Sequence, residues 1–153
     1  MEKLKIYLDT SVYNRPFDDQ RQTKIRLETE AFLSILEKAI SGSIIIIGSS
    51  ALFYENSLNP FTERRERVES YIAIASKIVK LNTSIRKKAQ LLENIGIDKI
   101  DSLHLAYAEY GGAQYFITCD DGIIRKISRN KDILTVEVFN PLEFILKEVF
   151  KNA

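Results

Sequence analysis

The sequence predicts an α/β fold, a three-layer α/β/α sandwich around a parallel sheet. Segments with strand character alternate with segments of helical periodicity, and such strands pair in parallel through right-handed crossovers. The isoleucine run 44–47 has no polar alternation, which is typical of a strand covered on both faces. No tract rich in proline, glycine or serine divides the chain, and its 153 residues fit one domain, residues 1–153.

Strands are predicted where β-branched and aromatic residues run together between turn signals. They are expected at residues 5–8, 44–47, 114–118 and 134–139. A polar turn at residues 9–11 ends the first strand, and an Asp-Asp-Gly turn at residues 120–122 follows the third. Acidic residues therefore follow two of the predicted strands directly.

Helices are predicted where apolar side chains recur every three or four residues. They are expected at residues 23–40, 51–55, 62–79, 83–94, 99–110 and 123–128, with a last helix from residue 141 onward. The ends carry recognisable signals. Ser49 and Ser50 can cap the second helix, Gly42 and Gly96 can end the first and the fourth, and Pro141 suits a first helical turn. The segment 15–19 is expected to be a loop.

Composition limits the possible chemistry. The chain has 22 Lys and Arg against 21 Asp and Glu, a net charge of +1, which argues against a general nucleic-acid coat but permits a local basic groove. With one cysteine and one histidine, neither a disulfide framework nor a His/Cys metal cage is available within one chain. Any metal must be held mainly by carboxylates. No signal peptide or bilayer-spanning run is recognised, so we expect a cytoplasmic protein that does not contact membranes.

Four acidic residues are expected to meet at one edge of the sheet. Asp9 follows the first strand and Asp120 the third, and open α/β sheets bind ligands beyond the carboxyl ends of their strands. Glu55 lies on the helix after the second strand, and Asp101 lies in the first turn of the helix before the third. Each could alone be a turn former, a helix-end charge or a solvated residue. Their joint placement favours a shared cleft.

Carboxylates brought so close repel one another and resist ionisation unless a cation lies among them. A hard divalent ion such as Mg²⁺ resolves the conflict, because it prefers oxygen ligands and keeps several waters. Such an ion can polarise a phosphodiester and lower the pKa of an attacking water. Acids at strand ends, without a histidine pair or a glycine-rich phosphate loop, therefore indicate metal-assisted phosphoryl chemistry.

Five short motifs follow one another along the chain, at residues 6–11 (IYLDTS), 50–55 (SALFYE), 100–106 (IDSLHLA), 116–121 (FITCDD) and 140–145 (NPLEFI). As an ordered set they resemble the PIN-domain family, which includes the VapC-like toxin ribonucleases of bacterial toxin–antitoxin pairs. The resemblance implies a compact α/β/α sandwich with about five parallel strands. It also implies Mg²⁺- or Mn²⁺-dependent hydrolysis of RNA that leaves a 5′-phosphate, a homodimer, and a small antitoxin that blocks the cleft.

The resemblance also implies which residues form the site, namely Asp9, Glu55, Asp101 and Asp120. The three aspartates would hold the metal, and the glutamate would be a further ligand or position the attacking water. Ser11 and Thr118 would bind a carboxylate or a metal-bound water. Asp121 would be an auxiliary acid or an alternative to Asp120. Many relatives carry asparagine two residues after the first acid, where this chain has the shorter Ser11.

Several other residues have both a functional and a structural interpretation. Arg15, Arg125 and Lys126 are candidates for contacting RNA phosphates, because they follow the acidic strand ends along the chain, although exposed cations are usually only solvated. His104, one turn after the third acid, could ligate a metal, but we interpret it as a structural histidine packed against the sheet. Cys119 is interpreted as a small core residue.

Three other functions compete with metal-assisted RNA hydrolysis. A receiver-like phosphoacceptor domain would begin with an acidic pair after the first strand and need a lysine at a late strand end, and neither is present around Asp9 or at the end of 115–118. A phosphatase of the Asp-x-Asp type would need an acid where Ser11 stands. A catalytically inactive RNA- or protein-binding module of the same fold is the third possibility, and the intact set of acids disfavours it.

Overall fold

A computed structural model describes residues 3–151, without the side chains of residues 149 and 150. Its centre is a sheet of five parallel strands in the order β3-β2-β1-β4-β5. The strands are β1 (Leu4–Leu8), β2 (Ile44–Ser49), β3 (Lys77–Val79), β4 (Tyr115–Ile117) and β5 (Glu137–Phe139). The predicted α/β class and the five-stranded parallel sheet are therefore confirmed.

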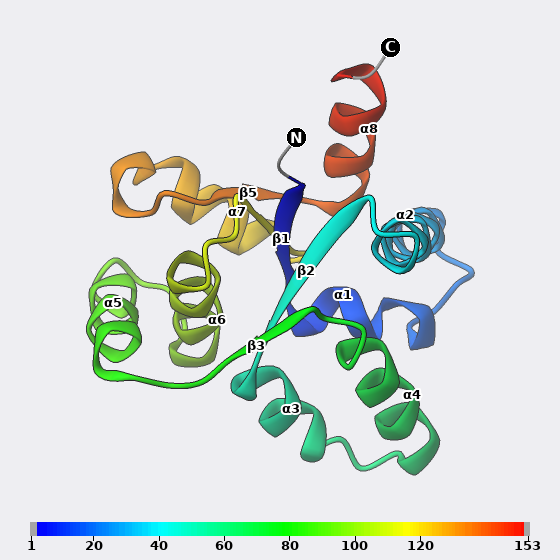
Figure 1. Cartoon of the computed structure of the whole chain (residues 1–153), viewed down its shortest axis with the longest axis horizontal. Helices are drawn as coiled ribbons and strands as arrows, with labels where there is room; N and C mark the ends of the chain where they lie inside the picture. Colours follow the sequence, from blue (N-terminus) through cyan, green and yellow to red (C-terminus); the bar gives the residue numbers. More distant parts are fainter. Residues whose placement is uncertain (1–2, 152–153) are drawn as a thin grey trace.

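Helices cover both faces of this sheet. They are α1 (Thr10–Asn14), α2 (Thr23–Ile40), α3 (Ser50–Ser57), α4 (Thr62–Ile72), α5 (Thr83–Asn94), α6 (Lys99–Tyr110), α7 (Asp121–Ser128) and α8 (Pro141–Lys151), with 3-10 turns at Arg15–Phe17 and Lys131–Ile133. Figure 1 shows α1, α2 and α4 on one side of the sheet and α5 and α6 on the other. Helix α3 continues from the carboxyl end of β2, so it lies at the strand ends where a site was expected.

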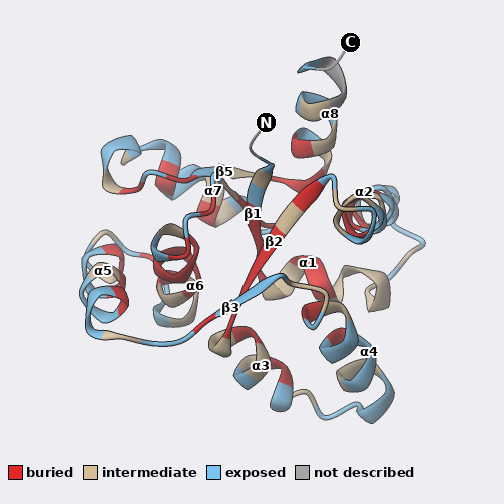
Figure 2. Ribbon diagram, in the orientation of Figure 1, coloured by how far each residue is buried: buried red, intermediate tan, exposed pale blue. Residues whose placement is uncertain are grey.

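The two central strands form the middle of the core. Ile6, Tyr7 and Leu8 of β1 are completely buried, and β2 is buried along most of its length (Figure 2). Ile6 lies opposite Ile46 of β2 and Tyr115 of β4, so neighbouring strands are held on both sides of β1. Complete burial of one isoleucine or leucine side chain stabilises a fold by roughly 1.5–3 kcal/mol. Apolar burial therefore fixes the pairing register of β1 with β2 and β4, and this register determines where the strand ends lie relative to one another.

One predicted helix is wrong in its second half. The segment 62–79 was expected to be one helix, but the helix ends at Ile72 and residues 77–79 form the edge strand β3. The reason is tertiary, because β2 would otherwise present unpaired backbone groups on this side. The backbone N–H of Ser76 already donates to the carbonyl of Ile46, and β3 continues this pairing in parallel.

Two predicted turns are also helix starts. The polar turn expected at residues 9–11 is the beginning of α1, and the loop expected at 15–19 starts with a 3-10 turn. The turn expected at residues 120–122 is likewise the beginning of α7. Asp9 and Asp120 are the N-cap residues of these helices, and an aspartate that caps a helix has the same local sequence signature as one that forms a turn.

A buried carboxylate connects three segments on the α2 side of the sheet. Glu28 of α2 is completely buried, and its Oε1 accepts from Arg15 Nε at 2.9 Å and lies 2.8 Å from Arg15 Nη2. Its Oε2 accepts a hydrogen bond from the side-chain amide of Asn140, directly before α8. Both carboxylate oxygens are therefore satisfied, by the segment after α1 and by the start of the last helix.

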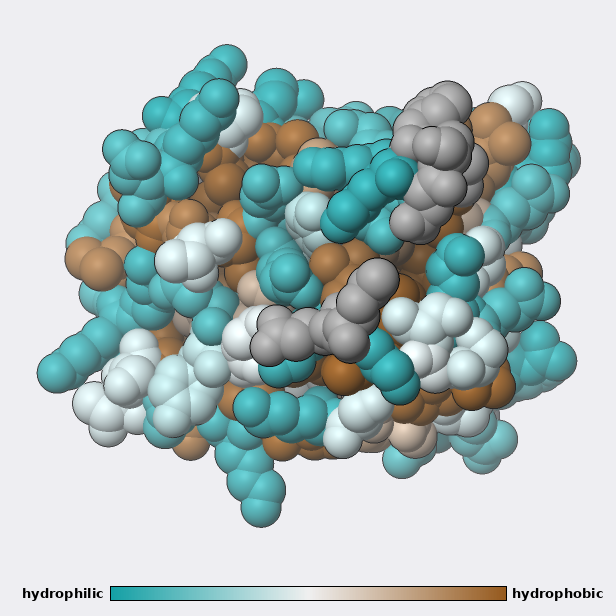
Figure 3. Space-filling view, turned by 45° about the horizontal axis from the view of Figure 1, so that its top comes forward, coloured by the Kyte–Doolittle hydropathy of each residue, from teal (hydrophilic) through white to brown (hydrophobic). Residues whose placement is uncertain are grey.

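No helix within residues 3–151 is long and apolar enough to cross a membrane. In Figure 3, hydrophilic side chains surround smaller hydrophobic patches on the face near the chain ends.

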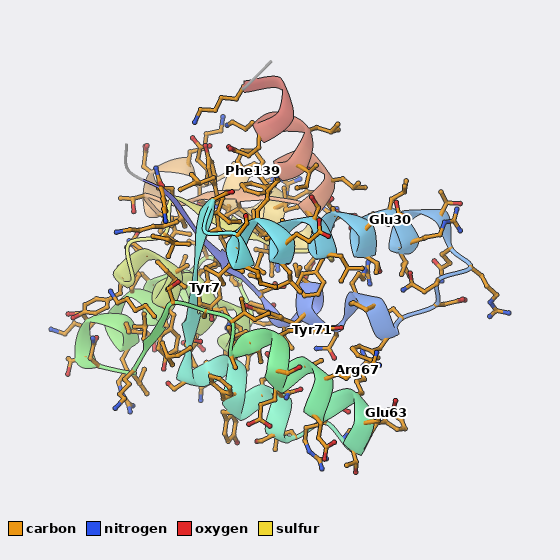
Figure 4. The ribbon with its side chains drawn as sticks, turned by 45° about the vertical axis from the view of Figure 1, so that its right-hand side comes forward. Tyr7, Glu30, Glu63, Arg67, Tyr71 and Phe139 are labelled. Carbon is orange, nitrogen blue, oxygen red and sulfur yellow. The ribbon has the colours of Figure 1, made fainter. Side chains whose placement is uncertain are left out.

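Removal of the buried carboxylate should destabilise the fold strongly. For Glu28→Ala we expect the free energy of unfolding to fall by about 3–5 kcal/mol, because the guanidinium of Arg15 loses its buried partner. Urea denaturation measures this change. The matched control is Glu30→Ala on the same helix, since Glu30 is exposed and points away from the molecule (Figure 4) and should change stability by less than about 0.5 kcal/mol. Equal effects of the two substitutions would contradict the stabilising role of Glu28.

Candidate functional site

A pocket of about 250 Å³ lies where the central strands end. It is lined by Asp9, Thr10, Ser11, Asn14, Glu55, Asp101, His104 and Asp120. All four acids expected at this edge of the sheet therefore line one pocket. They come from the end of β1, from α3, from α6 and from the residue before α7.

Asp9 is the most buried acid of the pocket, with 4% of its surface exposed. Its Oδ1 accepts from the backbone N–H of Ser11 at 3.0 Å and from the Ser11 hydroxyl at 2.5 Å, and its Oδ2 accepts from the Thr118 hydroxyl at 2.6 Å. Burial raises the pKa of Asp9, and the hydrogen bonds from Ser11 and Thr118 oppose that rise. Its carboxylate is thus held in one orientation by two hydroxyl groups.

Asp120 is fixed by the helix that it caps. Its Oδ1 accepts from the backbone N–H groups of Gly122 at 2.8 Å and Ile123 at 3.4 Å. Its own backbone N–H donates to the Thr118 hydroxyl, which in turn donates to Asp9. Thr118 therefore connects the two acids that follow neighbouring strands.

Asp101 differs from the other acids of the pocket because no hydrogen bond from residues 3–151 holds its carboxylate. It is half-buried in the first turn of α6, and its carboxylate forms no hydrogen bond or ion pair with residues 3–151. Burial, together with the negative charges of Asp9 and Asp120, raises the pKa of Asp101 to about 6. The pocket thus has an excess of negative charge that the described side chains do not neutralise.

Glu55 is held at the wall of the pocket by two donors. Its Oε1 lies 3.0 Å from His104 Nε2 and accepts a hydrogen bond from the Thr10 hydroxyl. Burial raises the pKa of Glu55, but the hydrogen bonds from His104 and Thr10 outweigh it, so the pKa lies below its ordinary value. Glu55 is therefore ionised at neutral pH.

The chemistry of these donors fits a hard divalent cation. Within residues 3–151, no three His, Cys, Asp or Glu side chains lie close enough together to form an assembled metal site. The acids nevertheless present oxygen atoms only, which Mg²⁺ and Mn²⁺ prefer. The unpartnered carboxylate of Asp101, with its raised pKa, is the group that a cation in this pocket would stabilise.

The other predicted residues lie outside the pocket lining. Asp121 is exposed and forms an ion pair with Lys24 at 2.9 Å, and this contact lowers its pKa. Arg15 is engaged in the buried ion pair described above, which does not favour an RNA-contacting role. Arg125 and Lys126 are exposed on α7, directly after Asp120, and their role stays a prediction.

Three residues of the lining were not assigned to the site from sequence. Thr10 and Asn14 are one helical turn apart on α1, so recognition of that helix would have placed both at the pocket. His104 was interpreted as a packed structural residue. It is indeed buried, but its Nε2 also contacts Glu55, which the spacing of two separate helices does not reveal.

Comparisons with known proteins identify a family and two solved structures of similar fold. A family model described as the PIN domain matches residues 6–130. Two solved structures share the fold at 16% sequence identity, and each comparison covers 90% of this chain and 98% of the other. They are VapBC2 from Rickettsia felis bound to a DNA fragment from its promoter, with a TM-score of 0.60, and DNA-bound VapBC from Salmonella typhimurium, with a TM-score of 0.54. A comparison with curated protein sequences finds no match.

The ionised carboxylate of Asp101 should lower the stability of the metal-free protein. With a chelator present, we expect Asp101→Asn to raise the melting temperature by a few degrees at pH 8, because it removes one of three mutually repelling carboxylates. A raised carboxyl pKa means that ionisation destabilises the fold. The gain should therefore be absent below pH 3.8, grow as pH rises, and be complete above about pH 6.

Differential scanning calorimetry across this pH range measures the effect. The control is Asp132→Asn, an exposed aspartate outside the pocket lining, which should change the melting temperature little across this pH range. A loss of stability in Asp101→Asn at pH 8 would contradict the account of charge repulsion.

Proposed function

Because the chain belongs to the PIN-domain family, we propose that it is a metal-dependent endoribonuclease. The observation that carries the proposal is the shared pocket of Asp9, Glu55, Asp101 and Asp120, in which the Asp101 carboxylate forms no hydrogen bond or ion pair with residues 3–151. A phosphodiester bond is the substrate class that suits a divalent ion held by carboxylates.

In this proposal Asp9, Asp101 and Asp120 would hold Mg²⁺ or Mn²⁺. When bound, the ion would supply Lewis-acid stabilisation of the charge on the scissile phosphate and a lowered pKa for an attacking water. Ser11 and Thr118 hold the Asp9 carboxylate in place before any ligand binds, so little reorganisation is needed during the reaction.

Glu55 would orient the attacking water. Its Oε1 is occupied by His104 and Thr10, whereas its Oε2 accepts no hydrogen bond from residues 3–151. The free Oε2 can accept a hydrogen bond from water and direct the water's lone pair toward phosphorus. Because the pKa of Glu55 is lowered, this group is suited to orienting the water more than to removing its proton.

RNA binding and protein partners are part of the same proposal. Arg125 and Lys126 would contact backbone phosphates beside the pocket, since both are exposed on the helix that Asp120 caps. The structural neighbours are VapBC complexes bound to DNA, which supports a toxin role with a small antitoxin as partner. A homodimer in the cytoplasm remains our expectation for the assembly.

Substitution of the most buried acid tests the activity. For Asp9→Asn we expect cleavage of single-stranded RNA with Mg²⁺ or Mn²⁺ to fall about 100-fold or more, because a metal ligand with fixed orientation loses its charge. Gel analysis of labelled RNA measures cleavage and shows whether products carry a 5′-phosphate. The matched control is Asp132→Asn, an exposed aspartate outside the pocket lining, which should cleave like the wild type.

Isothermal titration with Mn²⁺ supplies a second measurement. Wild-type protein should bind the ion, and Asp9→Asn and Asp120→Asn should each weaken binding. Undiminished cleavage by Asp9→Asn would overturn the assignment of this residue. A wild-type protein that neither cleaves RNA nor binds Mn²⁺ would instead be an inactive binding module of the same fold.

A further inference from the structure

A chain of buried hydrogen bonds leads from the core to Glu55. The Leu52 backbone N–H lies 3.2 Å from Ser49 Oγ, and Ser49 Oγ lies 2.7 Å from the Tyr7 hydroxyl. The Tyr7 hydroxyl lies 2.6 Å from His104 Nδ1, and His104 Nε2 lies 3.0 Å from Glu55 Oε1. The three linking side chains come from β1, β2 and α6, and none is more than 1% exposed. Tyr7 is labelled beside the strands in Figure 4.

When His104 is neutral, the Glu55 end of this chain determines the direction of the bonds from His104 back to Ser49. The backbone N–H of Leu52 can only donate, and the ionised carboxylate of Glu55 can only accept. A neutral imidazole has one donor and one acceptor, so the proton of His104 lies on Nε2 and is donated to Glu55. Its Nδ1 must then accept the hydroxyl proton of Tyr7. Ser49, which accepts from Leu52, donates its own proton to Tyr7.

Burial favours the same arrangement of protons. The pKa of Tyr7 is raised well above its ordinary value, chiefly because the side chain is completely buried, so the hydroxyl keeps its proton. Reversal of any one link would leave a buried donor facing a donor or an acceptor facing an acceptor, which costs about 1–3 kcal/mol. The chain is therefore directed from the N-cap of α3 toward the pocket.

We propose that His104 is a positioning residue that acts through Glu55, an inference that rests on the proposed ribonuclease function. Nε2 of His104 and the hydroxyl of Thr10 both engage Oε1 of Glu55, which lines the pocket, and so fix the carboxylate while leaving Oε2 without a donor. Tyr7 in turn fixes the ring and the tautomer of His104. The orientation of the proposed water acceptor is thus built into the core of the sheet.

Nuclear magnetic resonance tests the directed chain in metal-free protein without any substrate. His104 is the only histidine of the chain, so all histidine ring ¹⁵N signals belong to this residue. We expect a protonated Nε2 and an unprotonated Nδ1 near neutral pH. Tyr7→Phe should weaken this preference and shift the ring ¹⁵N signals, because Nδ1 loses its partner while Glu55 still accepts from Nε2. Tyr13→Phe is the matched control, since the Tyr13 hydroxyl is also fully buried but has no partner in residues 3–151, and this variant should leave the spectrum unchanged.

Two similar substitutions of the histidine test its action on catalysis. In His104→Gln, the side-chain amide nitrogen can take the place of Nε2 and donate to Glu55. In His104→Asn, the side chain is shorter and its amide nitrogen cannot reach Glu55. For His104→Asn we expect kcat for RNA cleavage to fall about 10- to 100-fold with KM within about twofold, and for His104→Gln we expect most of kcat to return.

The outcomes separate this inference from the proposed function. A wild-type spectrum in which Nδ1 is protonated would overturn the directed chain even if the protein cleaves RNA. Equal losses of kcat in His104→Gln and His104→Asn, parallel to losses in melting temperature, would show a purely structural histidine. A wild type that cleaves no RNA would overturn the ribonuclease proposal and with it the catalytic role of His104, whereas the ring ¹⁵N signals would still decide the hydrogen-bond chain.

Discussion

Repulsion among the carboxylates at the strand ends is the constraint to which the rest of the site responds. The fold compensates the charges of the two aspartates that follow strands, Asp9 and Asp120, with its own groups. Asp9 accepts hydroxyl and backbone donors, and Asp120 accepts the N–H groups at the start of α7. Asp101 receives no such compensation, and its pKa of about 6 records the cost. Repulsion among these carboxylates lowers the stability of the metal-free protein, and a divalent cation bound among them would relieve it. The loss of stability and the proposed chemistry therefore have the same origin.

The same local device places both of the compensated acids. β1 and β4 are parallel neighbours, with Leu8 opposite Ile117, so the residues that follow each strand meet at one edge of the sheet. At that edge Asp9 donates its backbone N–H to the Ile117 carbonyl and receives the Thr118 hydroxyl. Shortly after each strand an aspartate caps the next helix, Asp9 for α1 and Asp120 for α7. Sheet register and helix capping together therefore give the distance between two acids that are remote in the sequence.

The sequence predicted most where a local pattern agreed with the final structure. The helix at 83–94 was placed correctly because its apolar repeat and its closing glycine are unambiguous. β3 was missed because its pairing with the edge of β2, and not its own residues, makes it a strand. α1 was missed because five residues contain too few turns to show a period. The strand topology alone was enough to predict that the acids lie close together. The contact between His104 and Glu55 could not be predicted, because it depends on how two helices pack.

The buried carboxylate of Glu28 has a consequence for where this protein can be cut. The family match ends at residue 130, but Asn140, which follows the last strand, supplies the partner of Glu28 Oε2 and also caps α8 by accepting from the backbone N–H of Leu142 at 2.8 Å. A fragment trimmed to the matched region would lose β5 as well and would leave half of a buried charge unsatisfied. The boundary of the folding unit therefore lies beyond the boundary of the family pattern, and expression of shorter pieces would yield an incomplete core.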